Sequence, residues 1–134
     1  MVLRMLALAT LGLCGCAAVA PAHADRFESA AITVADAGLQ PAGVARVRRF
    51  GTVVFRNALP GMPVRVTVMR PLASSLPCST MLGFIPEGDA SVARGVLPQD
   101  FAALCFHEAG SFPFVVEVTG RQLRGTVEVL DEVR

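Results

Sequence analysis

The sequence contains no lysine, and its 12 basic side chains are all arginines. They stand against 11 aspartates and glutamates, so the formal net charge is only +1. The densest basic cluster is Arg46, Arg48 and Arg49. Arg46 and Arg48 share one face of an alternating stretch, which a solvated strand face explains more simply than an anion site. A nearly neutral chain without a basic run offers no surface to a polyanion, so we expect no nucleic-acid partner.

Catalytic motifs are also missing. No serine lies in a Gly-x-Ser-x-Gly turn, no glycine-rich loop has the pattern that holds phosphate, and no cysteines have zinc-site spacing. His107 and Glu108 are residue types found in hydrolases, but nothing in the sequence places them next to a nucleophile. We therefore expect a protein that is not an enzyme.

Long hydrophobic runs are absent except at the N terminus. There Arg4 precedes the apolar residues 5–13, which are too few to span a bilayer and have the length of a signal-peptide core. The small-x-small residues 22–24 predict cleavage after Ala24. Residues 1–24 are thus a predicted signal peptide, and we expect the protein in the periplasm or outside the cell.

A second interpretation of the N terminus stays open. Residues 13–16, Leu-Cys-Gly-Cys, resemble a bacterial lipobox, in which the final cysteine is lipidated. The signal would then end before Cys16 and the product would be a membrane-anchored lipoprotein. Only lipidation at Cys16 would bring the protein to a membrane. In both cases residues 25–134 are enough for one domain with its own core.

Cysteine is scarce in the mature chain, since cleavage after Ala24 leaves only Cys78 and Cys105. An even pair in an exported protein is more typical of a disulfide than of a reactive thiol. A Cys78–Cys105 bond would close a loop of about 28 residues, for which the chain-entropy estimate is about 3 to 4 kcal/mol of stabilisation.

Alternating patterns predict β-strands and no long helix. In residues 64–70 the pattern is clearest, with Val64, Val66 and Val68 expected in the core and Arg65 and Thr67 facing outward. The predicted strands, about seven in number and separated by turn residues, are residues 31–35, 43–48, 52–56, 64–70, 101–106, 111–118 and 123–130. This spacing favours an all-β sandwich.

Residues 71–100 break the alternation with repeated prolines and glycines, so we expect a long inserted loop there. Long loops inside compact domains usually have a function. A disulfide between Cys78 and Cys105 would tether this loop, which we expect to be the contact surface for an unknown protein partner.

Two parts of the chain resemble cupredoxins, the superfamily of plastocyanin and azurin. Residues 32–41 and 51–57 resemble the opening of the family, with its first strand, glycine turn and V-x-F-x-N motif. Residues 106–116 resemble f-x-x-p/a-G-x-Y-x-Y-x-C, and residues 123–129 resemble the closing M-x-G-x-V-x-V. The match covers most of the mature chain outside residues 70–100. It implies a single-domain Greek-key β-sandwich.

The resemblance also implies where copper ligands would lie, and no ligand is there. The family's first histidine corresponds to Val64, its C-x-x-H pair to Val116 and Thr119, and its methionine to Leu123. A blue-copper site needs two imidazoles, a thiolate and a weak axial ligand. The mature chain has a single histidine, His107, so no shift of the alignment restores the site. We expect no copper cofactor.

The remaining soft or imidazole donors support an alternative. Met62, Met81 and His107 are weak candidates for Cu(I), with Cys78 and Cys105 as a redox-controlled pair. That protein would handle copper or take part in iron transport. The preferred hypothesis is an exported, non-catalytic binding or structural module on a degenerate cupredoxin scaffold.

Overall fold

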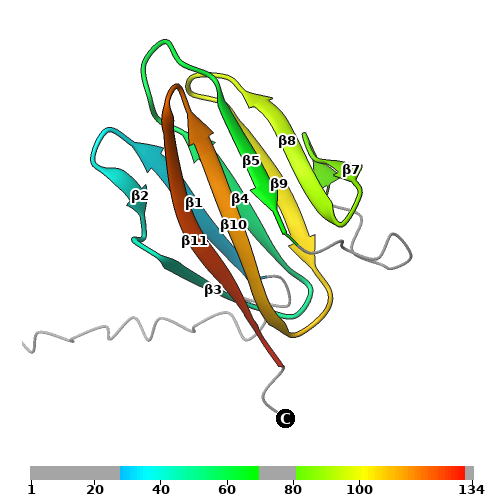
Figure 1. The fold of residues 1–134 in the computed structure, drawn as a ribbon. Helices are drawn as coiled ribbons and strands as arrows, with labels where there is room; N and C mark the ends of the chain where they lie inside the picture. The colour runs from blue at the N-terminus through cyan, green and yellow to red at the C-terminus, as the bar shows by residue number, and fades with distance from the viewer. Residues whose placement is uncertain (1–27, 70–80, 132–134) are drawn as a thin grey trace, which may run out of the picture.

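The computed structural model describes residues 28–69 and 81–131. The predicted signal peptide, Cys16 and Cys78 lie outside this range. Every regular element in the described residues is a β-strand. This part of the chain contains no helix that is long and apolar enough to cross a membrane. The strands form two sheets that pack face to face (Figure 1).

Sheet A has five strands in the order β2-β1-β4-β9-β6. Their bounds are Gly38–Gln40 for β2, Ser29–Ala35 for β1, Gly51–Asn57 for β4, Phe101–Phe106 for β9 and Met81–Leu82 for β6. Strand β1 runs parallel to β4, and the other pairs are antiparallel.

Sheet B has six strands in the order β3-β11-β10-β5-β8-β7. Their bounds are Val44–Arg48 for β3, Arg121–Leu130 for β11, Gly110–Val118 for β10, Val64–Val68 for β5, Ala90–Val96 for β8 and Ile85–Glu87 for β7. Only the β3–β11 pair is parallel.

Alternation places one side of each strand in a common core. Val64, Val66 and Val68 are buried as predicted, while Arg65 is exposed and Thr67 half-buried. Aromatic rings join the two sheets: the centroid of Phe55 lies 5.2 Å from that of Phe114 in an edge-to-face arrangement. Such contacts add to the burial of apolar area that drives folding.

The sandwich is closed on both sides by segments that pass from sheet A to sheet B. On one side β2 leads through Pro41 into β3, and on the other β6 leads through Gly83 and Phe84 into β7. Phe84 is buried on this second side, with its ring 5.7 Å from that of Phe55. The edge strands β2, β6 and β7 are very short, which limits the unpaired backbone at the sheet edges.

The fold class is confirmed, but the predicted loop 71–100 is wrong over residues 81–96. Strands β6, β7 and β8 lie there, and β8 pairs with β5 over most of its length. Pro86 is accommodated because β7 is an edge strand, and Gly95 lies where the β5–β8 register shifts. Edge positions and bulges tolerate these residues, so their presence did not exclude strands.

Candidate functional site

Three connections meet at one end of the sandwich, at the top of Figure 1, which we call the upper end. They are residues 58–63 between β4 and β5, residues 97–100 between β8 and β9, and the β10–β11 turn at residues 119–120. In a cupredoxin the copper ligands that correspond to Val64, Val116, Thr119 and Leu123 would gather here.

Asn57, the last residue of β4, holds two of these connections together. Its side chain is fully buried, and its Nδ2 donates to the carbonyl oxygens of Met62 at 2.7 Å and Val96 at 2.9 Å. Its Oδ1 accepts from the backbone N–H of Leu59 at 2.9 Å. All of the amide's hydrogen-bonding groups therefore have partners, which is what burial of a polar side chain requires.

The sequence predicted a strand that ends at residue 56, with Asn57 noted only as the asparagine of the V-x-F-x-N motif. The signal that could have revealed more was an asparagine followed by a Pro-Gly-Met-Pro loop, because asparagine bonds readily to nearby backbone. The partner at Val96 lies 39 residues away, and no local pattern predicts it.

Side chains next to these anchored carbonyls form an apolar surface. Met62 is 38% exposed and Leu97 is 58% exposed. Pro60 and Pro63 are exposed in the same connection as Met62. Since Asn57 binds both Met62 and Val96, the backbone that carries this apolar surface is held in place.

The β10–β11 hairpin occupies the place of a ligand loop. The ladder continues to the turn, with Val116 opposite Leu123 and Val118 opposite Arg121. The turn consists of Thr119, which is exposed, and Gly120, whose φ of +71° favours glycine. Three of the four positions that would carry copper ligands are thus in a tight two-residue hairpin.

Val64 and Val116 are buried in the core, and Leu123 packs against it. Val64 pairs with Val96 of β8, whereas Val116 pairs with Val66 of β5. Hydrocarbon side chains have no lone pair to give a metal, and a threonine hydroxyl is a poor substitute for imidazole. These residues do not fit a type-1 copper ion.

In the described part of the chain, no three His, Cys, Asp or Glu side chains lie in an arrangement that could hold a metal ion. The candidates Met62, Met81 and His107 are not brought together either. Met62 follows the end of β4, while His107 follows Phe106, which pairs with the first residue of β4. The length of β4 separates them by roughly 20 Å at 3.3 Å per residue. Met81 pairs with Leu104, part-way between.

His107 is buried at the opposite, lower end. Its carbonyl oxygen accepts a hydrogen bond from Nε of Arg49 at 3.2 Å. Cys105 is buried on the outer face of sheet A, where its Sγ lies 3.4 Å from the carbonyl oxygen of Phe50. The predicted partner Cys78 lies outside the described residues, so that pairing stays a prediction.

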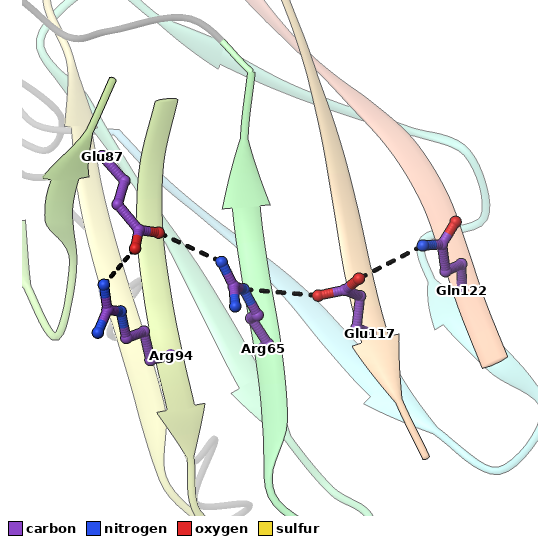
Figure 2. A network of polar contacts seen from close by, with 5 residues as sticks. All are labelled: Arg65, Glu87, Arg94, Glu117 and Gln122. Atoms are coloured by element: carbon purple, nitrogen blue, oxygen red, sulfur yellow. Dashed lines mark hydrogen bonds and ion pairs between the residues drawn. The ribbon is translucent and has the colours of Figure 1, made fainter. Parts of the chain in front are cut away.

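The outer face of sheet B carries a row of polar contacts across five strands (Figure 2). Arg65 on β5 contacts Glu87 at 3.2 Å and Glu117 at 3.5 Å. Glu87 also pairs with Arg94, and Gln122 donates to Glu117 at 3.3 Å. Arg124 extends the row by donating to Gln122 at 3.1 Å. We call this row the charged ladder.

An open groove lies beside the ladder between β5, β10 and β11. It is lined by Arg65, Glu117, Gln122 and Arg124, together with Thr67, Val115 and Met69. Arg65 and Glu117, which face the groove, pair with each other, and Arg124 donates to Gln122. Arg46, which was predicted to lie on a solvated strand face, is exposed on β3 and pairs with Glu128 at 2.8 Å.

No protein-family model matches this chain, and no curated protein matches it by sequence. Solved structures do match it. A variant of amicyanin in the Cu(I) form is superimposed with a TM-score of 0.54 and 19% identity, covering 76% of this chain and 82% of amicyanin. The fold is that of a cupredoxin.

Other amicyanin variants agree with this result. An oxidised one gives a TM-score of 0.54 at 18% identity, with the same coverage. A reduced Cu(I) form at pH 4 gives 0.53 at 19% identity and covers 80% of this chain and 85% of amicyanin. At such low identity the likeness establishes the cupredoxin fold, and the predicted resemblance is confirmed at that level.

Proposed function

We propose that this chain is an exported, non-catalytic protein-binding module on a cupredoxin fold, with no type-1 copper centre. The observation that carries this proposal is the β10–β11 hairpin, in which Val116 faces Leu123 across a continuous ladder and Thr119 occupies the turn. A copper-binding cupredoxin needs donor atoms at these three positions.

The packing of the upper end supports the same proposal. Val64 and Val116 are almost completely buried among apolar neighbours. Apolar side chains stabilise this region by burial and need no polar partner, so the scaffold does not depend on a metal. The fold without a metal still has an exposed surface for a partner, and residues 81–100 contribute part of that surface.

Export rests on the predicted signal peptide, residues 1–24, with lipidation at Cys16 as the alternative. Intact mass spectrometry of the protein produced from its full gene distinguishes the two. A mass that begins at Asp25 is expected, whereas a diacylated mass that begins at Cys16 would replace soluble export with a lipoprotein.

Copper binding is the direct test. The exported full-length product is titrated with Cu(I) and with Cu(II), in oxidised and in reduced form, and bound metal is counted by native mass spectrometry. Amicyanin serves as the positive control. We expect no stoichiometric copper in either state and no intense visible absorption band from a Cu(II)–thiolate bond.

Tight stoichiometric copper in any of these conditions would overturn the proposal. If Cu(I) bound and Met62→Leu with Met81→Leu abolished it, the copper-handling alternative would replace the binding module. A Cu(II)–thiolate band would instead show that a blue-copper centre forms despite the substituted positions.

A further inference from the structure

The outer face of sheet A differs from the rest of the surface in having almost no charge. Outward-facing residues on its strands are mainly alanine, threonine and valine, and the only charged residue in any of its five strands is Arg56. Arg56 is exposed and lies at the upper end of β4, directly opposite Phe101 of β9.

Two large apolar side chains are exposed on the strands next to β4: Phe101 on β9, directly opposite Arg56, and Leu82 on β6, one strand farther away. Phe101 is 46% exposed and Leu82 is 53% exposed. Leu82 pairs with Ala103, so it is the diagonal neighbour of Phe101 on the same face. We call Leu82, Phe101 and Arg56 the sheet A strip.

Arg56 forms no ion pair and no side-chain hydrogen bond with the described residues. Arg65, on the outer face of sheet B, is an instructive contrast because it contacts two carboxylates, those of Glu87 and Glu117. An exposed guanidinium next to an exposed aromatic ring combines arginine and phenylalanine, two residue types that are enriched in interfaces.

We propose that the sheet A strip binds a partner-protein segment in which a carboxylate lies next to an apolar side chain. The carboxylate pairs with the Arg56 guanidinium, which can donate two parallel hydrogen bonds to it. The apolar side chain packs on Phe101 and Leu82 and removes them from water. The inference rests on the proposed binding function and identifies its surface and the chemistry of its partner.

Charge complementarity selects this occupant over a second copy of the chain. A two-fold symmetric dimer through the strip would bring two Arg56 side chains into one interface. The carboxylate next to the strip, that of Asp100, already accepts a hydrogen bond from the backbone N–H of Phe101 at 2.8 Å. An acidic and apolar segment satisfies both the charge and the exposed apolar surface.

A random peptide display library tests the proposal on the full-length exported protein. We expect selected peptides to contain Asp or Glu next to an aromatic or aliphatic residue. Arg56→Glu should weaken their binding at least tenfold, and selection on that variant should favour Lys or Arg instead. Phe101→Ser should also weaken binding about tenfold. Arg124→Glu, on the other sheet, is the matched control and should leave binding unchanged.

Each variant is checked by its thermal unfolding midpoint, so that a folding defect is not mistaken for a binding defect. Three results would overturn the proposed binding at the sheet A strip. They are selected peptides that lack an acidic residue, no enrichment above the Phe101→Ser variant, and peptide binding that Arg56→Glu leaves unchanged. A concentration-dependent dimer that Phe101→Ser dissociates would assign the strip to a second copy. The copper titrations decide the proposed function independently of these results.

Discussion

The two outer faces of this sandwich follow the same alternation but are chemically different. On sheet B the outward side chains of five strands pair with one another in the charged ladder (Figure 2). On sheet A the single charge, Arg56, has no partner among the described residues. Most charged groups on the outer face of sheet B pair within the chain, whereas Arg56 on sheet A forms no ion pair with the described residues and lies next to exposed apolar side chains.

The ladder also explains an irregularity in burial. Val92 points to the outer side of sheet B, yet it is buried. In the register of β7, β8 and β5, the contacts of Glu87 with Arg94 and Arg65 cross the row that contains Val92. Long charged side chains can cover apolar residues in this way. The outer face of sheet A has no such cover over Phe101 and Leu82.

The largest expected effect concerns the Cys78–Cys105 disulfide proposed for the sheet A side. Reduction, or Cys78→Ala combined with Cys105→Ala, should lower the free energy of unfolding by about 3 to 4 kcal/mol. Urea denaturation with and without reductant measures this difference. A mass that rises on alkylation without prior reduction would show free thiols and contradict the pairing.

The next effect comes from Asn57, which anchors the upper end that both faces share. Asn57→Ala removes three side-chain hydrogen bonds and leaves the carbonyls of Met62 and Val96 without that donor and the N–H of Leu59 without that acceptor. We expect a loss of about 3 kcal/mol, in the upper range for buried polar groups. Asn57→Asp retains only the acceptor for Leu59 and should recover little of the loss, so full stability of either variant would refute this role.

Gly125 on β11 lies opposite Phe114 of β10, which belongs to the core. A Cβ at this position would lie 2.5 Å from Cζ of Phe114 and 3.0 Å from the carbonyl oxygen of Gly43. Gly125→Ala should therefore cost about 2 kcal/mol through displacement of the Phe114 ring. Gly95→Ala, where a Cβ meets nothing within 4 Å, is the control and should change the unfolding midpoint very little.

The charged ladder itself should contribute little stability. Glu87→Gln breaks contacts to Arg65 and Arg94 at partly exposed positions, and we expect a loss of about 0.5 kcal/mol. Because salt screens such pairs, the difference from the wild type should shrink as ionic strength rises. A loss that salt does not change would contradict an electrostatic origin of the effect.

The smallest effect sharpens the contrast between the faces most directly. Arg56→Gln should leave the free energy of unfolding within about 0.3 kcal/mol of the wild type, because Arg56 forms no ion pair with the described residues. Arg65→Gln, its counterpart on sheet B, should destabilise the protein measurably in low salt. If Arg56→Gln were the more destabilising of the two, Arg56 would have an intramolecular role and the sheet A strip would lose its support.

Much of the fold could be predicted from the sequence, because the alternation of apolar and polar residues along a strand indicates which of its sides is buried. The strands predicted at residues 101–106 and 111–118 agree with β9 and β10 to within one residue. Strand β8 was missed because Gly95 and the nearby prolines are typical of loops. Only pairing with β5 makes a strand with a register shift favourable at that place.

The sequence by itself determined two things about this protein. Its alternating apolar residues specify a β-sandwich, since burial of one side of each strand is encoded residue by residue. At three of the positions that the resemblance assigns to copper ligands, Val64, Val116 and Leu123 have hydrocarbon side chains without a lone pair for a metal, since donor chemistry belongs to the side chain alone.

Tertiary structure decided which side chains meet. Three examples bring together strands that are distant in the sequence: the hydrogen bond from Asn57 to Val96, the contact of Arg65 with Glu117 in the charged ladder, and the position of Arg56 opposite Phe101. Sheet register sets these neighbours, and a shift of one residue would turn every side chain to the other face. Whether a charge is paired or free for a partner therefore depends on the assembled sheets.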